Sequence, residues 1–167
     1  MLENQSKIQL AVNANAAEIA LLSRASIEKG LGWKWTAEAV KRAIKNKSTN
    51  VVVAKEGKIL AGFGIMKYGY QKANLDLLAV KSDFRRSGTG TCIVRWLEEV
   101  ARVAGIFHIY VQLRQKNSAA KKFYLSLGYS VIDIVPGYYN GIENALVMYR
   151  YLGLTEKVDS VFPISGE

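Results

Sequence analysis

Hydrophobic positions along the chain change period several times, and each change predicts a boundary between elements. The segment 8–12 has a strand-like pattern, and the Ala-, Leu- and Ile-rich stretch after it predicts a helix that ends near Gly30. Asn15, with Glu18 three residues later, is typical of a capping box at the start of this helix. A second amphipathic helix is predicted over 36–45, capped by its first residue, a threonine.

The middle of the chain predicts an antiparallel meander. Two apolar runs, 51–55 and 59–68, are separated by the turn residues Glu56, Gly57 and Lys58, and this arrangement is typical of a hairpin. A further strand is predicted over 74–80.

A helical period then begins at Gly88 and ends at Gly105. Outward pairs with i, i+4 spacing, Arg95 with Glu99 and Glu98 with Arg102, predict a solvated helix face.

The remaining segments complete a mixed sheet: a strand at 106–113, a helix at 117–127 and a final strand pair at 131–135 and 145–151. The order strand, helix, helix, three strands, helix, strand, helix, two strands indicates an α+β fold rather than alternating βαβ units. No repeat or linker interrupts this order. We therefore expect residues 1–167 to form a single domain, with a core over about 8–151 and a C-terminal tail, 152–167, that has no clear periodicity.

Composition supports one globular domain, because the chain has 167 residues and half of them are hydrophobic. Lysine and arginine number 23 against 14 acidic residues, which gives a net charge of +9 and suggests an anionic partner. The densest basic cluster lies at the end of a predicted helix without interleaved aromatic residues, so nucleic acid is not the expected partner. That cluster consists of Lys41, Arg42, Lys45 and Lys47.

The single cysteine, Cys92, cannot form an intramolecular disulfide, and no His/Cys cluster has the spacing of metal ligands. We expect Cys92 to pack in the first turn of its helix rather than act as a nucleophile. The first ten residues lack the pattern of a signal peptide, and no apolar stretch approaches the length of a membrane span. These features predict a cytoplasmic protein without a metal.

A glycine-punctuated turn joins the strand at 74–80 to the next helix. Backbone N–H groups at a helix N-terminus, together with the helix dipole, make an anion site. An ATP-type loop would need Lys-Ser/Thr where Thr91 and Cys92 stand, and a dinucleotide loop would need a third glycine where Ile93 stands. The pattern that fits is Arg-x-x-Gly-x-Gly, over residues 85–90.

This hexapeptide resembles the acyl-CoA pyrophosphate loop of the GNAT superfamily of N-acetyltransferases. The run 117–129 is similar to the second signature of that family, Asn-x-x-Ala-x-x-Phe-Tyr-x-x-Leu-Gly-Phe/Tyr, with every named position matched. The segment 137–148 is similar to the Tyr-Tyr…Glu-Asn/Asp-Ala-x-x-Met segment of enzymes that acetylate protein N-terminal α-amines, including ribosomal-protein alanine acetyltransferases. The resemblance spans about 8–151 and implies a largely antiparallel mixed sheet of about seven strands flanked by four helices.

The resemblance implies that a neutral amine attacks the thioester of acetyl-CoA directly, through a tetrahedral intermediate and without an acyl-enzyme. A protein or peptide N-terminal α-amine is the expected acceptor. A polyamine or aminoglycoside acceptor, and a module that binds CoA or nucleic acid without catalysis, remain open, as does a homodimer.

The resemblance also assigns cofactor-binding residues. The backbone of the strand end would pair with the pantetheine arm, and the loop would bind the pyrophosphate through N–H groups and arginine charge. Asn117 would contact the cofactor and cap its helix. Tyr124 would contact it too and donate a proton to the leaving thiolate. The strand and loop residues are Leu78, Ala79, Val80, Arg85, Arg86, Ser87, Gly88, Thr89 and Gly90.

The general base does not carry over from the family. Its two usual positions correspond to Asn74 and Gln112, and neither amide accepts a proton at neutral pH. Asp76 shares a strand face with Asn74 and is the nearest ionisable substitute. His108 lies about 14 Å from Gln112 along its strand and is expected to be a satisfied sheet histidine. The other candidates are Glu143, Tyr138, Tyr139 and an ordered water.

An acceptor site is expected where the loop between the first two helices meets the C-terminal hairpin. Trp33 with Trp35 would border it from the loop, and Tyr138, Tyr139 and Glu143 from the hairpin. Core packing by the tryptophans, and a structural role of the tyrosines in the hairpin, are the alternatives.

Overall fold

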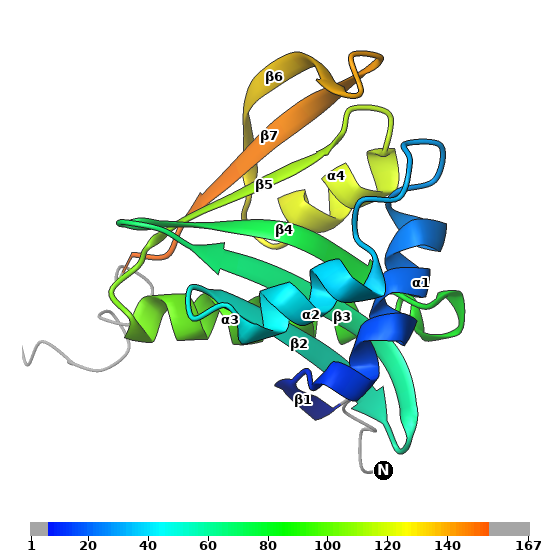
Figure 1. Ribbon diagram of the computed structural model, residues 1–167. Coiled ribbons are helices and arrows are strands. Elements are labelled where there is room, and N and C mark those ends of the chain that lie inside the picture. The colour runs from blue at the N-terminus through cyan, green and yellow to red at the C-terminus, as the bar shows by residue number, and fades with distance from the viewer. Residues whose placement is uncertain (1–6, 154–167) are drawn as a thin grey trace, which may run out of the picture.

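Residues 7–153 are described by a computed structural model, which holds one seven-stranded sheet with helices on both faces (Figure 1). The predicted order of elements is confirmed. The strands are β1 (Lys7–Leu10), β2 (Thr49–Glu56), β3 (Ile59–Tyr68), β4 (Lys72–Val80), β5 (His108–Arg114), β6 (Ser130–Tyr139) and β7 (Glu143–Tyr151). The helices are α1 (Ala16–Ser26), α2 (Ala37–Lys45), α3 (Thr89–Val103) and α4 (Ser118–Ser126), with short 3₁₀ turns η1 (Asn13–Asn15) and η2 (Ser82–Phe84).

The extent of the single domain, 1–167, stays a prediction. Of the expected tail 152–167, residues 154–167 lie outside the described residues.

The strands are ordered β1-β2-β3-β4-β5-β7-β6, and only β4 and β5 are parallel neighbours. Their pairing is short, since it joins Lys72–Leu75 of β4 to His108–Val111 of β5. Figure 1 shows β5 and β7 turning away from β4 beyond this point. The sheet is therefore continuous at one end and split at the other.

Two separate cores hold the helices to the sheet. On one face, α3 and α4 pack on β2–β5 and β7 through residues such as Leu97 and Tyr124. On the other face, α1 and α2 pack on β2–β4 through residues such as Ile19 and Val40. Gly64 in β3 permits the close approach of α3, because a Cβ there would lie 2.7 Å from the Ile93 side chain.

A β-bulge in β4 changes which face its side chains occupy. Met66 of β3 lies opposite Leu75, and the next residue of β3, Ile65, lies opposite Leu77, so Asp76 is the extra residue. Leu75 belongs to the core under α3 and Leu77 to the core under α1. Alternation along a regular strand cannot produce this change, so the bulge at Asp76 lets one strand serve both cores.

The start and the end of α1 differ from prediction. The helix ends at Ser26, before Gly30, and the buried Glu28 carboxylate accepts hydrogen bonds from the N–H groups of Lys34 (2.7 Å) and Trp35 (3.1 Å) in the following loop. The Asn15 side chain accepts from the Val12 N–H (2.9 Å) and makes no capping bond to α1. The Glu28 side chain therefore binds the backbone of the loop that follows the helix. The Asn15 side chain binds the backbone that precedes the helix and does not cap it.

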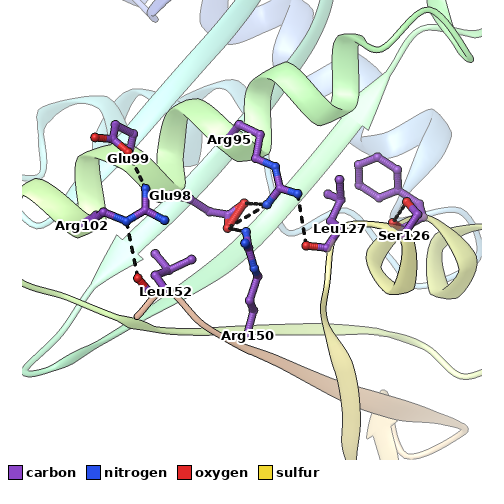
Figure 2. A network of polar contacts seen from close by, with 9 residues as sticks. Arg95, Glu98, Glu99, Arg102, Ser126, Leu127, Arg150 and Leu152 are labelled. Carbon is purple, nitrogen blue, oxygen red and sulfur yellow. Dashed lines mark hydrogen bonds and ion pairs between the residues drawn. The ribbon is translucent and has the colours of Figure 1, made fainter. Parts of the chain in front are cut away.

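The predicted solvated face of α3 is wrong for Glu98. This residue is 1% exposed, and its carboxylate accepts from Arg95, 2.9 Å away, and from Arg150 of β7 (Figure 2). Arg102 pairs with Glu99 at 2.5 Å rather than with Glu98. The i, i+4 spacing could not show that β7 brings a second arginine to α3. The packing role predicted for Cys92 is also wrong, because its side chain is exposed.

Candidate functional site

The split between β4 and β5 leaves the end of β4 without a strand partner on that side. In the described residues, β4 pairs with β5 only as far as Leu75, so Leu77–Val80 pair with β3 alone. A strand edge of this kind offers backbone N–H and C=O groups to an extended ligand. The predicted cofactor-binding strand, Leu78–Val80, is part of this edge.

The loop at 85–90 follows this strand end and leads into α3. Arg86 and Gly88 both adopt positive φ, 61° and 84°, and this left-handed backbone is strained for arginine and easy for glycine. No backbone acceptor among the described residues pairs with the N–H groups of Arg86, Ser87, Gly88 or Gly90. These donors lie at the positive end of the 15-residue α3, so the loop can bind an anion.

Contacts within the protein hold this loop in place. The Arg85 Nε donates to the Val80 carbonyl at 3.0 Å, and the Ser87 hydroxyl bonds to the Phe84 carbonyl and lies 3.0 Å from Thr89 Oγ1. Gly90 packs against α4, because a Cβ at Gly90 would lie 3.3 Å from the Phe123 ring. The loop and the second signature are therefore in direct contact.

The second signature contributes two candidate site residues, Asn117 and Tyr124. Asn117 caps α4 as predicted, with its Oδ1 accepting from Ala120 N–H at 3.0 Å. Tyr124 is 5% exposed, and burial raises the pKa of its phenol, with a further contribution from the charge of Tyr139.

Arg114, at the end of β5, contacts the C-terminal hairpin. Its guanidinium lies over the Tyr139 ring at 6.0 Å, and its Nε is 3.5 Å from Glu143 Oε2. That Nε is buried, and among the described residues it has no partner with hydrogen-bond geometry. Burial raises the pKa of Tyr139 to about 12, Tyr138 and Glu143 add to this shift, and Arg114 opposes it.

Two hydrogen bonds join the loop between α1 and α2 to this end of the sheet. Arg114 Nη2 donates to the Lys29 carbonyl at 2.7 Å, and Asn140, in the β6–β7 turn, donates to the Leu31 carbonyl at 2.6 Å. Tyr138 packs edge to face on the Tyr139 ring, with 4.9 Å between the ring centroids. Trp33 is 40% exposed beneath Arg24, with 4.7 Å between the guanidinium and the ring centroid.

Asp76 shares a strand face with Asn74, as predicted, and accepts a hydrogen bond from the Asn74 amide at 2.6 Å. Burial raises the pKa of the Asp76 carboxyl above its ordinary value, while the Asn74 hydrogen bond and the Lys67 charge oppose the rise. The parallel register of β4 and β5 places Asn74 beside Tyr110, so Gln112 is the residue level with Asp76 where the strands part.

Sequence reasoning missed Arg114 and Asn140, which bond to the loop between α1 and α2 at one end of the site. The alternation in β5 could have indicated Arg114, because it lies two residues beyond Gln112 on the same face. No local signal marks Asn140, whose partner is 109 residues away.

His108 is satisfied, as expected, because its Nδ1 lies 2.8 Å from the Tyr149 hydroxyl. Within residues 7–153, no three His, Cys, Asp or Glu side chains gather as a metal site. No helix in this part of the chain is long and apolar enough to cross a membrane.

Comparison with known proteins gives a family match over residues 47–131, to the family described as Acetyltransferase (GNAT) domain. The [Ribosomal protein bS18]-alanine N-acetyltransferase of Escherichia coli (strain K12) is 30% identical over 102 residues, which cover 59% of this chain and 68% of that protein. N-alpha-acetyltransferase 20 of Dictyostelium discoideum is 32% identical over 104 residues, covering 62% of this chain and 58% of that protein.

Solved structures share the fold. The ribosomal-protein-S18-alanine N-acetyltransferase from Escherichia coli superposes with a TM-score of 0.75 at 20% identity, covering 92% of this chain and 97% of that one. An aminoglycoside 6'-N-acetyltransferase complexed with coenzyme A gives 0.72 at 23% identity, covering 88% and 97%. The predicted GNAT-type fold is thereby confirmed.

Proposed function

The chain belongs to the GNAT family of acetyl-CoA-dependent N-acetyltransferases, and we propose that its acceptor is the α-amine at the N-terminus of a protein or peptide. One observation carries the proposal: the hairpin residues Tyr139 and Glu143 lie against Arg114 at the end of β5. The segment that resembles N-terminal acetyltransferases therefore lies beside the part of β5 beyond its pairing with β4. Relatives named as alanine N-acetyltransferase and N-alpha-acetyltransferase support the same acceptor class.

The residues at the split sheet fit acetyl-CoA. The unpaired edge at Leu78–Val80 suits the extended pantetheine arm, and the N–H groups of the loop 85–90 suit its pyrophosphate. Arg85 and Arg86 add positive charge there, and Asn117 contributes its Nδ2, since its Oδ1 already caps α4. When bound, acetyl-CoA supplies the thioester that the amine attacks.

Tyr124 acts as the proton donor to the leaving sulfur. A donor must hold its proton in the resting enzyme, and burial keeps the Tyr124 phenol protonated by raising its pKa. Among the described residues its hydroxyl has no hydrogen-bond partner, so the proton is not committed to another group.

Asp76 acts as the general base, directly or through a water. Its raised pKa makes the carboxylate a stronger base than an ordinary aspartate, which suits proton removal from an ammonium group near neutral pH. Asn74 orients the carboxylate by donating to Oδ1. Asp76 thus takes the role for which Asn74 and Gln112 are chemically unsuited.

The acceptor is held by Glu143 and Tyr139, with Tyr138 and Trp33 further out. Glu143 is 25% exposed in its side chain, and its only ion pair in the described part of the chain is the 3.5 Å approach to Arg114. A carboxylate with this spare capacity can accept hydrogen bonds from an α-ammonium group before it loses its proton.

The test uses acetyl-CoA with a panel of acceptors and follows thiol release. The panel holds peptides with a free N-terminus and an internal lysine, the same peptides with a blocked N-terminus, polyamines and aminoglycosides. We expect turnover only with the free N-termini, with acetylation mapped to the α-amine by mass spectrometry. Turnover confined to blocked peptides or small amines would contradict the proposed acceptor. No turnover, despite a CoA-induced rise in Tm, would leave a CoA-binding module.

A further inference from the structure

The residues proposed to bind the acceptor come from two parts of the chain that are far apart in the sequence. Trp33 lies in the loop between α1 and α2, whereas Tyr139 and Glu143 lie in the C-terminal hairpin. An acceptor amine reaches the thioester only if both parts keep a fixed place relative to the end of α4 that is proposed to bind CoA. The contacts that join these parts therefore bear on the reaction.

Arg114, the last residue of β5, is bonded to the loop. Its Nη2 donates to the Lys29 carbonyl at 2.7 Å. The neighbouring Glu28 carboxylate accepts hydrogen bonds from the N–H groups of Lys34 and Trp35. The loop is therefore braced internally by Glu28 and attached to β5 through Arg114.

The same guanidinium lies against a cross-strand pair of the hairpin. Tyr139 of β6 is directly opposite Glu143 of β7, and residues in such a pair share a face. The guanidinium is 6.0 Å from the Tyr139 ring centroid, and its Nε is 3.5 Å from Glu143 Oε2. A guanidinium can contact a carbonyl, a carboxylate and a ring together, because it is planar and its donors point in fixed directions.

The backbone at Arg114 is tied to the start of the second signature. The Arg114 carbonyl accepts from the N–H of Asn117, which caps α4, at 2.9 Å. The next residue, Gln115, bonds twice to Asn144 of β7: its N–H donates to the Asn144 carbonyl and its Oε1 accepts from the Asn144 amide, each at 3.0 Å. The Arg114 side chain therefore extends from a backbone that is fixed relative to α4.

We propose that Arg114 is a positioning residue: it aligns Glu143, Tyr139 and the α1–α2 loop with the end of α4 that binds CoA. The inference rests on the proposed function and deepens it, because it assigns the group that orients the acceptor-binding carboxylate. The Arg114 Nη2 is bonded to the loop, and its Nε is buried beside Glu143. These placements favour contact with groups of the protein over contact with the acceptor.

The test measures kcat and KM for a peptide with a free N-terminus. Arg114→Met keeps an apolar stem and removes the guanidinium, so the acceptor KM should rise about tenfold with kcat nearly unchanged. The CoA-induced rise in Tm should stay the same. Arg102→Met is the matched control, because Arg102 also joins a carboxylate, that of Glu99, to a backbone carbonyl, that of Leu152, but from α3. This control should leave KM unchanged.

A double-mutant cycle tests whether Arg114 acts through Glu143. The variant that combines Arg114→Met with Glu143→Gln should have a KM near that of Arg114→Met alone, below the product of the two single increases. Arg114→Lys should restore part of the KM, because lysine keeps the charge and lacks the planar fork. This conservative variant also keeps the test decisive if Arg114→Met fails to fold.

The outcomes separate this inference from the proposed function. An unchanged KM in Arg114→Met or in Glu143→Gln, or single increases that multiply in the double variant, would overturn the inference and leave the acceptor class standing. A loss of kcat together with the CoA-induced rise in Tm would assign Arg114 a purely structural role and also overturn it. Turnover of small amines but not of peptides would overturn the acceptor class, and the same cycle with that amine would still decide the role of Arg114. No turnover of any acceptor would overturn both.

Discussion

Each face of the sheet carries a glutamate–arginine cluster that involves β7. The two clusters differ in how many ion pairs and hydrogen bonds their charged groups make. Under α3, Glu98 has a side chain only 2% exposed and binds both Arg95 and Arg150. Arg95 also donates to the Leu127 carbonyl at 3.3 Å (Figure 2). On the other face, Glu143 is 25% exposed and lies 3.5 Å from Arg114, whose Nε makes no hydrogen bond to a described residue.

This difference in bonding distinguishes an ion cluster that stabilises the fold from one whose polar atoms are still available to a ligand. A buried carboxylate needs its full set of partners, and Glu98 has them, so nothing remains for a ligand. Glu143 and Arg114 keep unused bonding capacity beside Tyr139. Similar residue types therefore stabilise the fold on one face and can bind a substrate on the other.

The largest expected effect is the loss of the closed cluster. Glu98→Ala leaves two arginines without their shared carboxylate and should lower the free energy of unfolding by about 3 kcal/mol, or roughly 6–12 °C in Tm for a chain of this size. Glu99→Ala, one residue along, removes an exposed pair with Arg102 and should cost less than about 1 kcal/mol. Thermal unfolding of both variants tests this, and equal shifts would contradict the structural role of Glu98.

At the proposed active site, Tyr124→Phe should lower kcat by about 10²-fold with little change in CoA affinity, because it removes only the proton donor. Tyr129→Phe is the matched control. Its ring lies 5.4 Å from that of Tyr124, and its buried hydroxyl has no partner among the described residues. That variant should keep kcat and be at least as stable. Single-turnover rates and CoA titration make the measurement, and an unchanged kcat in Tyr124→Phe would remove Tyr124 as the donor.

Asp76→Asn should lower kcat/KM roughly tenfold or more and abolish the acid limb of the pH profile. In the unchanged chain, that limb should lie above the ordinary aspartate pKa, since burial raises the pKa of Asp76. Asp133→Asn, on the exposed strand β6, is the control and should keep the limb.

The Asp76→Asn variant should gain stability, although it loses activity. A carboxyl whose pKa is higher in the folded chain binds protons more tightly there, so its ionised form lowers stability as pH rises. Asp76→Asn should therefore raise Tm at pH 7 by roughly 1–3 °C, and the gain should disappear below the ordinary aspartate pKa. A gain that persists at low pH would mean that ionisation is not the cause.

The smallest effect is expected at Glu143. Glu143→Gln keeps the size of the side chain and removes its charge, which should raise the acceptor KM about fivefold with kcat nearly unchanged. Glu56→Gln, on the distant β2–β3 hairpin, is the control. A loss in kcat without a change in KM would instead indicate that Glu143 takes part in proton transfer.

Local pattern predicted the order of the elements and the loop at 85–90, because period, turn residues and glycine positions act over a few neighbouring residues. The cap at Asn117 and the shared face of Asn74 and Asp76 were predictable for the same reason. The end of α1 was not, since it depends on where Glu28 finds its hydrogen-bond donors six and seven residues later.

The sequence by itself thus determined the family and the fold and predicted an anion-binding loop at 85–90, because each depends on residues close together in the chain. Only the tertiary structure decided that Glu98 is buried, since its partner Arg150 is 52 residues away. Only the tertiary structure joined Arg114 and Asn140 to the α1–α2 loop. It also brought four rings from β5 and β7 into contact, those of His108, Tyr110, Tyr149 and Tyr151. The physical reason is that the burial and the ion-pair partners of a side chain depend on which strand packs beside it. The spacing of residues within one element does not identify that strand.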